Sequence, residues 1–245
     1  MITFRFLLMD IAEIFKIENE ESFNKIAIET FNSQYHSIDV YRKYINNRGV
    51  NVNQISHYKD IPFLPIEFFK LFSVKKSKTK TQRTFLSSGT TNTSRSKHHV
   101  TDIKLYEESF INGFIRNYGD PKDWIILSLL PSYIEQGDSS LIYMVNHLMK
   151  MTKNENSQFI SNNIENVFKK LKSKKVLLIG VSYALLDLAE KINIDLSKWT
   201  IMETGGMKGR RKEIIRSELH SKLNSSFNTK QIHSEYGMTE LLSQA

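Results

Sequence analysis

Apolar and polar positions in the second half of the chain follow two alternating patterns. Short runs of consecutive apolar residues are typical of strands buried on both faces, and each is followed by residues with apolar side chains three or four positions apart, as in helices. The predicted strands lie at 123–131, 174–180, 199–206 and 230–237. The predicted helices lie at 102–117, 138–150, 162–173, 182–192 and 211–227. This alternation predicts an α/β fold with a mostly parallel sheet flanked by helices.

The first part of the chain has a different pattern. Residues 19–47 carry apolar side chains at helical spacing. Residues 61–72 contain two of the four prolines, which predicts an extended segment before a short helical turn. A basic stretch at 74–82 reads as a loop or hairpin. We therefore expect an N-terminal helical segment, 1–75, packed on an α/β core, 76–245.

Composition excludes several classes of protein. A hydrophobic content of 40% with 24% charged residues is ordinary for a soluble globular domain. The absence of cysteine excludes disulfides, thiolate metal sites and cysteine nucleophiles, and the histidines lack metal-binding spacing. The apolar N-terminus is interrupted by Asp10 and Glu13, so a signal peptide or integral membrane segment is not expected. We expect a cytoplasmic protein.

The formal charge of +8 admits nucleic acid, an anionic membrane surface or an anionic ligand as a partner. Binding of nucleic acid is the least expected of these, because the basic clusters are not interleaved with aromatic residues as such interfaces require. Charge alone does not choose between the other two.

The first candidate site is a loop rich in hydroxyls after the apolar pair Phe85-Leu86. Its residues are Ser87, Ser88, Gly89, Thr90 and Thr91. Successive backbone N–H groups and hydroxyls around a glycine can enclose a phosphate. The spacing of a Walker loop or of a dinucleotide-binding loop is absent. A solvent-exposed linker is the alternative.

The second candidate loop follows the predicted strand 199–206. Gly205, Gly206 and Gly209 lie within five residues and would let a flat ligand approach the backbone. A simple turn before a helix would use the same glycines. The nearby Lys208, Arg210 and Arg211 could neutralise an anion or begin a solvated helix.

The third candidate loop follows the last predicted strand. Tyr236 could stack on a base, Thr239 could bond a phosphate oxygen, and Glu240 could hold magnesium, with Gly237 between them. Alternatively, Thr239 and Glu240 cap and open a helix.

Together these motifs resemble a known family. The Ser-Ser-Gly-Thr-Thr loop, followed later by Glu-Tyr-Gly-Met-Thr-Glu, is similar to the paired signature of adenylate-forming enzymes. The stretches "LPSYIEQGDSSLIYMVNHLM", "METGGMKGRRKEIIRSELH" and "IHSEYGMTELLSQA" resemble the acyl-protein synthetase (LuxE-type) branch. The likeness extends over roughly 20–245. It implies the large N-terminal domain of that superfamily, with the small C-terminal domain absent.

The resemblance also implies an activity. Members activate long-chain fatty acids with ATP and Mg²⁺ to an acyl-adenylate, then pass the acyl group to a protein thiol, in luminescent bacteria together with an acyl reductase. A coenzyme A-forming ligase of the phenylacetate type and a non-catalytic nucleotide-binding remnant are the alternatives.

Roles for individual residues come with this resemblance. The loop from Ser87 to Thr91 would embrace the β- and γ-phosphates, while Gly205 and Gly206 would line the adenine pocket. Tyr236, with Gly237, would pack on adenine, Thr239 would contact the α-phosphate, and Glu240 would bind Mg²⁺.

Two features depart from the family pattern. The usual Gly and Pro-Lys after the phosphate loop are replaced by residues 92–97, which leaves open whether Arg95 or Lys97 is the cation of this loop. The sequence also ends at Ala245, before the ribose-binding aspartate, the catalytic lysine and the acyl-accepting cysteine of the family. We therefore expect an N-terminal fragment of such a ligase.

Overall fold

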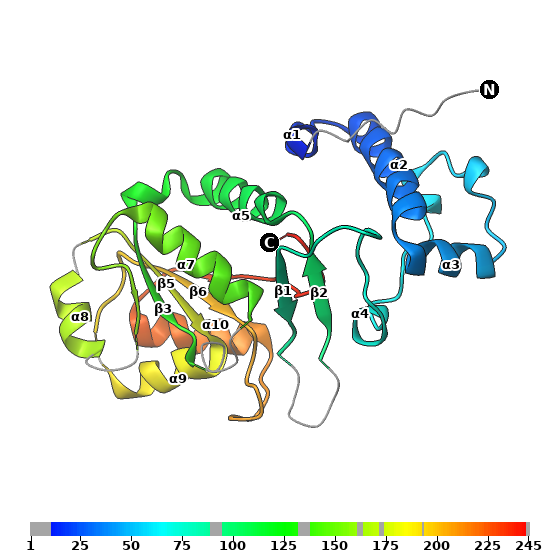
Figure 1. The fold of residues 1–245 in the computed structure, drawn as a ribbon. Coiled ribbons are helices and arrows are strands. Elements are labelled where there is room, and N and C mark those ends of the chain that lie inside the picture. Colours follow the sequence, from blue (N-terminus) through cyan, green and yellow to red (C-terminus); the bar gives the residue numbers. More distant parts are fainter. Residues whose placement is uncertain are drawn as a thin grey trace. The chain divides into compact units, whose positions relative to one another are not determined.

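The computed structural model describes residues 11–88, 95–131, 138–160, 164–171, 174–192 and 194–243 (Figure 1). The chain divides into two compact units, 1–109 and 110–245. The expected division at 75/76 stays a prediction. No helix in the described ranges is both long enough and apolar enough to span a membrane.

The first unit begins with helices, as predicted for 19–47. They are α1 (Ile11–Ile14), α2 (Glu20–Ser37) and α3 (Asp39–Asn47). Helix α2 starts at a capping box, in which the Asn19 side chain accepts a hydrogen bond from the Ser22 N–H and the Ser22 hydroxyl accepts one from the Asn19 N–H. Ile38 is extended and separates α2 from α3. The two helices enclose a small core of Phe31, Tyr41 and Ile45.

An extended segment then leads into a hairpin. Two 3₁₀ turns, Val52–Gln54 and Tyr58–Asp60, precede the four-residue helix α4 (Phe68–Leu71), which is the short helical turn predicted for 61–72. Strands β1 (Arg83–Leu86) and β2 (Lys97–Val100) then pair antiparallel. The loop that begins at Ser87 therefore belongs to a two-stranded antiparallel sheet and not to the parallel sheet.

The second unit contains the predicted parallel sheet. Its strands are β3 (Ile125–Leu129), β4 (Gln158–Phe159), β5 (Val176–Val181), β6 (Thr200–Thr204) and β7 (Ile232–Ser234). They lie in the order β4-β3-β5-β6-β7, and all neighbours run parallel. Strands β3 and β5 are buried along their whole length, which explains why they are apolar throughout except for Ser128 in β3.

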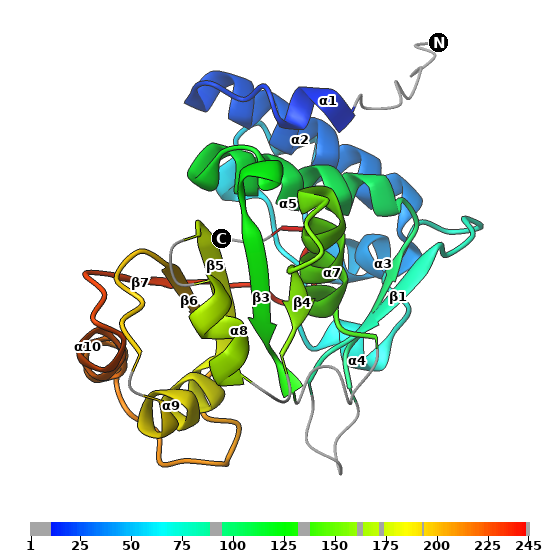
Figure 2. The same cartoon turned by 90° about the vertical axis from the view of Figure 1, so that its left-hand side faces the viewer.

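Helices flank this sheet (Figure 2). They are α5 (Ile103–Tyr118), α7 (Ser140–Thr152), α8 (Ile164–Leu171), α9 (Ser182–Lys191) and α10 (Arg216–Phe227). Helix α5 begins in the first unit. Helix α7 starts where its sequence predicts, because the Ser139 hydroxyl accepts a hydrogen bond from the Ile142 N–H. Helix α10 starts at Arg216 rather than at Arg211. The α/β prediction is thus confirmed at the level of fold class.

Helix α9 lies close to strand β5 because β5 carries a glycine. A Cβ atom added at Gly180 would lie 2.6 Å from both Cγ and Cδ2 of Leu185. Leu185 is fully buried. Gly180 therefore sets the distance between α9 and the sheet, and with it the position of Ser182 at the first turn of α9.

Candidate functional site

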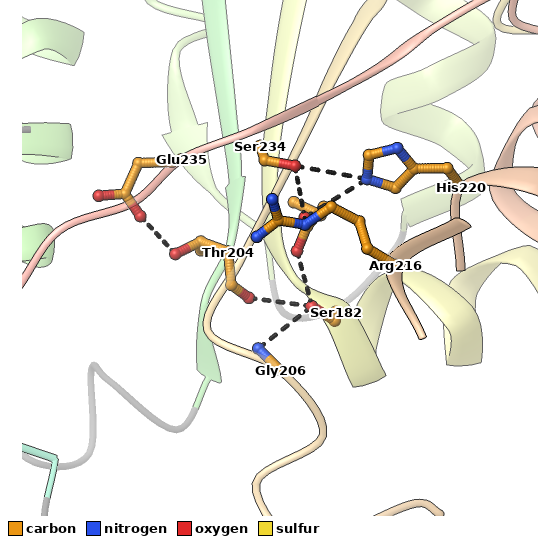
Figure 3. A network of polar contacts seen from close by, with 8 residues as sticks. Ser182, Thr204, Gly206, Arg216, His220, Ser234 and Glu235 are labelled. Atoms are coloured by element: carbon orange, nitrogen blue, oxygen red, sulfur yellow. Dashed lines mark hydrogen bonds and ion pairs between the residues drawn. The ribbon is translucent and has the colours of Figure 1, made fainter. Parts of the chain in front are cut away.

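Three strands of the parallel sheet end side by side in polar residues. Strand β5 leads directly into Ser182, β6 ends in Glu203 and Thr204, and β7 ends in Ser234 before Glu235. Because β5, β6 and β7 are adjacent and parallel, these ends meet at one edge of the sheet. Figure 3 shows the side chains of this edge turned toward one another.

The Glu203 carboxylate is the centre of this network. The Ser182 hydroxyl donates to its Oε2 at 3.0 Å, and the Ser234 hydroxyl donates to its Oε1 at 2.6 Å (Figure 3). Glu203 is only 6% exposed, and a buried carboxylate is costly unless it is hydrogen-bonded. The two serines supply those bonds and so connect β6 to the last residue of β7 and to the first residue after β5.

Helix α10 adds two nitrogen-bearing side chains beside the same carboxylate. His220 Nε2 lies 3.4 Å from Glu203 Oε1 and also 3.4 Å from the Ser234 hydroxyl. Arg216 Nε lies 3.7 Å from Glu203 Oε1, with most of its side chain in solvent. The network thus extends from the buried strand ends to the surface at the start of α10.

The glycine turn after β6 is held by this network. Gly205 and Gly206 have φ angles of 79° and 84°, the left-handed region that favours glycine. The Gly206 N–H lies 3.2 Å from the Ser182 hydroxyl and 3.1 Å from the Thr204 carbonyl oxygen, and both accept from it. An added Cβ at Gly206 would meet no atom of the described residues within 4 Å, so the turn leaves open space at this position among them.

The loop after β7 is held by hydrogen bonds to the last two residues of β6, Glu203 and Thr204. The Glu235 N–H donates to the Glu203 carbonyl oxygen at 2.9 Å, and the Thr204 hydroxyl donates to the Glu235 carboxyl group. Burial raises the pKa of Glu235; the Thr204 hydrogen bond opposes this shift and the nearby Glu203 charge adds to it. Glu235 is therefore a partly buried carboxyl group whose pKa lies above its ordinary value.

Of the remaining predicted residues of this loop, Tyr236 and Gly237 are exposed, and Thr239 and Glu240 are half-buried. Tyr236 is 58% exposed, and its hydroxyl lies 3.1 Å from the Met238 sulfur. Thr239 and Glu240 form a turn, in which the Leu241 N–H donates to the Met238 carbonyl oxygen at 3.0 Å. Residues 235–243 contain no helix, so the alternative in which Thr239 and Glu240 open a helix is not realised in this part of the chain.

The hydroxyl-rich loop belongs to the first unit. The Ser87 N–H donates to the Ser96 carbonyl oxygen at 3.1 Å, and the Ser87 hydroxyl accepts from the Ser96 N–H at 2.9 Å. Arg95 Nε donates to the Ser87 carbonyl oxygen, and Ser88 is exposed. Ser87 and Arg95 thus close the neck of the hairpin. Gly89, Thr90 and Thr91 lie outside the described residues.

One of the three basic residues near the glycine turn, Arg211, is paired with two carboxylates of α9. Arg211 Nε donates to Asp187 Oδ1 at 2.7 Å, and its two terminal nitrogens donate to Glu190 at 2.7 and 2.6 Å. These hydrogen bonds raise the pKa of Arg211 and lower that of Glu190. Arg211 ties the segment before α10 to α9, which explains why α10 begins later than its periodicity predicts.

The sequence did not single out Ser182 or His220. Ser182 is preceded by an uninterrupted apolar strand, and a lone serine there reads as an ordinary helix start. Glu203 gave the clearest available signal, since a carboxylate inside a buried strand requires partners. His220 reaches the site from α10, and its place follows only from the packing of that helix.

Within the described residues, no three His, Asp or Glu side chains gather into a metal site. Magnesium is commonly held by one carboxylate together with substrate phosphates, so this observation leaves the assignment of Glu240 as a prediction. A scan against protein-family models finds no match for the chain, and a search of curated proteins finds none either.

Proposed function

We propose that this chain takes part in the ATP-dependent activation of a carboxylic acid, a long-chain fatty acid, to an acyl-adenylate, followed by acyl transfer to a protein thiol. The observation that carries this proposal is the Glu203 network, which joins the Gly205–Gly206 turn to the Glu235–Tyr236 loop at adjacent strand ends. These are the two segments that the family resemblance assigns to adenine.

The local geometry suits a purine. The open space before Gly206 leaves the backbone accessible to a flat ring, and the exposed ring of Tyr236 offers a stacking surface. The carboxyl group of Glu235, on the same loop, can bond an amino group or a ring nitrogen. A base bound over these groups would also shield the Glu203 network from solvent.

The proposed chemistry needs positioning more than covalent help. A carboxylate oxygen of the acid bonds to the α-phosphorus of ATP, and the bond from that phosphorus to the β-bridging oxygen breaks, so that pyrophosphate leaves. Thr239 would contact the α-phosphate and Glu240 would hold Mg²⁺. Residues 87–91 would bind the leaving phosphates.

The test is ATP–pyrophosphate exchange with acids from acetate to stearate and with aryl acids, together with the Kd for ATP. We expect this chain to bind ATP, and we expect exchange with a long-chain acid when it is assayed with the family's ribose-binding aspartate and catalytic lysine present, as in a chain extended by about 100 residues. Tyr236→Ala should weaken ATP binding by roughly tenfold, because stacking on a base contributes about 1–3 kcal/mol.

Glu240→Ala should abolish Mg²⁺-dependent exchange and leave the fold intact, whereas Glu213→Ala, a matched change at an exposed carboxylate, should change neither. Full exchange in the Glu240→Ala variant would contradict the role of that residue. ATP binding without exchange for any acid, even in the extended chain, would contradict the ligase, and no ATP binding would contradict the nucleotide site itself.

A further inference from the structure

The whole formal excess of positive charge lies in one segment of the first unit. Of the 34 basic residues in the chain, eight lie within 68–101, where there is no Asp or Glu, and the other 26 are balanced by the 26 acidic residues. The eight are Lys70, Lys75, Lys76, Lys78, Lys80, Arg83, Arg95 and Lys97. Such segregation gives one part of the surface a strong positive potential.

The lysine-rich part of this segment is held in place by its backbone. The Ser77 N–H donates to the Ser37 carbonyl oxygen at 2.7 Å, which attaches the segment to the end of α2. Lys75 Nζ donates to the Thr79 carbonyl oxygen at 2.9 Å and so closes the loop. The side chains of three further lysines are exposed, and no ion pair is found for them among the described residues: Lys76, Lys78 and Lys80.

Large apolar side chains are exposed immediately before these lysines. Phe63 is 74% and Leu71 69% exposed, and Ile66 and Phe72 are also exposed. Exposed apolar side chains normally occur singly on a protein surface, so four of them within ten positions are unusual. We call residues 61–80, which hold both these side chains and the lysines, the basic–apolar segment.

Helix α4 shows that this exposure does not come from a missing core. The Phe68 ring packs 5.6 Å from that of Tyr44, and the Phe69 ring packs 5.4 Å from that of His98. These two residues attach the helix to the first unit. Leu71, at the end of the same short helix, remains in solvent.

We infer that the basic–apolar segment binds the surface of an anionic lipid bilayer. Apolar side chains that enter the headgroup region and lysines that attract anionic lipids are the two components of interfacial membrane binding. An acidic protein partner fits less well, because protein interfaces are enriched in arginine and depleted in lysine, whereas every cation between 61 and 80 is lysine. This inference does not depend on the proposed enzymatic activity.

The experiment is co-sedimentation of the whole chain with vesicles of phosphatidylcholine alone or mixed with phosphatidylglycerol, at low and high salt. We expect binding only to the anionic vesicles, weakened by salt. Lys76→Gln/Lys78→Gln/Lys80→Gln should weaken it by about fivefold per lysine, on the order of a hundredfold in all. Leu71→Ser should weaken it by about tenfold or more.

Matched controls come from the second unit. Lys122→Gln/Lys191→Gln/Lys230→Gln removes the same charge, and Ile215→Ser removes an equally exposed apolar side chain. If the triple lysine variant or Leu71→Ser bound anionic vesicles as tightly as its matched control, the inference would be overturned. Equal binding to neutral vesicles would overturn it too. Binding to polyglutamate but not to anionic vesicles would replace it with an acidic protein partner. Because all changed side chains are exposed, urea unfolding should show the fold unchanged.

Discussion

At the scale of single residues, Glu203 places an ionisable group where the sheet excludes water. Its carboxylate is tolerated because two serine hydroxyls donate to it and two α10 side chains lie beside it. Hydrogen bonds to a charged group are stronger than those between neutral groups, and removing one partner leaves the others unsatisfied. Glu203 should therefore matter for stability as well as for any ligand.

Replacing Glu203 by glutamine tests this. An amide oxygen accepts more weakly than a carboxylate, and its NH₂ group must face one of the serines. We expect Glu203→Gln to lower the free energy of unfolding by about 1–2 kcal/mol, measured by urea denaturation. Glu213→Gln, at an exposed carboxylate, should change it far less. Equal losses in the two variants would mean that the Glu203 bonds contribute nothing net.

The raised pKa of Glu235 predicts how the stability of the fold depends on pH. Its pKa is raised above 4.5 in the folded chain by burial, so the folded state resists its ionisation. The stability that the protonated carboxyl group contributes is complete below pH 4.5 and is lost as pH rises through the folded pKa. Glu235→Gln cannot ionise and should keep its stability over that range.

The measurement is urea unfolding of the wild type and Glu235→Gln from acid to neutral pH. The variant should become more stable relative to the wild type as pH rises. A difference that stays constant with pH, or that moves in the opposite direction, would contradict the raised pKa.

At the scale of elements, the packing of α9 on β5 depends on Gly180. Gly180→Ala would push a methyl group into the side chain of Leu185, which is fully buried. We expect a loss of about 1–3 kcal/mol in unfolding free energy. Gly113→Ala in α5 is the control, since its Cβ would meet no atom within 4 Å in the described part of the chain and alanine favours helix; it should stabilise by about 0.5–1 kcal/mol. Losses of equal size would contradict the packing argument.

The strands that are buried on both faces were the most predictable elements. The apolar runs at 123–131, 174–180 and 199–206 contain β3, β5 and β6, because both faces of those strands are buried. The two-residue strand β4 is too short to leave a pattern in the sequence. Helix α10 was predicted to begin at Arg211, because periodicity cannot show that Arg211 would instead pair with α9.

The candidate site was predictable only in part. The glycines at 205 and 206 could be recognised because three glycines lie within five residues after a predicted strand, and the first two adopt the left-handed φ angles that favour glycine. The network beneath them was not foreseen, because Ser182, His220 and Ser234 come from three separate elements. Residue types alone do not tell which serines and histidines a fold will bring to one carboxylate.

At the scale of the whole molecule, ligand binding and stability are linked. ATP at a hundred times its Kd should raise the free energy of unfolding by about 2.7 kcal/mol, because it binds the folded chain alone. Hydrogen exchange should slow at 203–206 and 234–240 when ATP and Mg²⁺ are added, with GTP as the control nucleotide. Protection by GTP equal to that by ATP would contradict an adenine pocket.

The order of the strands has a consequence for synthesis of the chain. From β3 onward the sheet gains β5, β6 and β7 in the order in which they leave the ribosome, each beside the one before it. Glu203 emerges with β6 and has no Ser234 to accept from until β7 has also emerged. The nascent chain thus holds an incompletely bonded carboxylate at the growing edge of its sheet, and docking of the final strand both covers that edge and completes the bonding of Glu203.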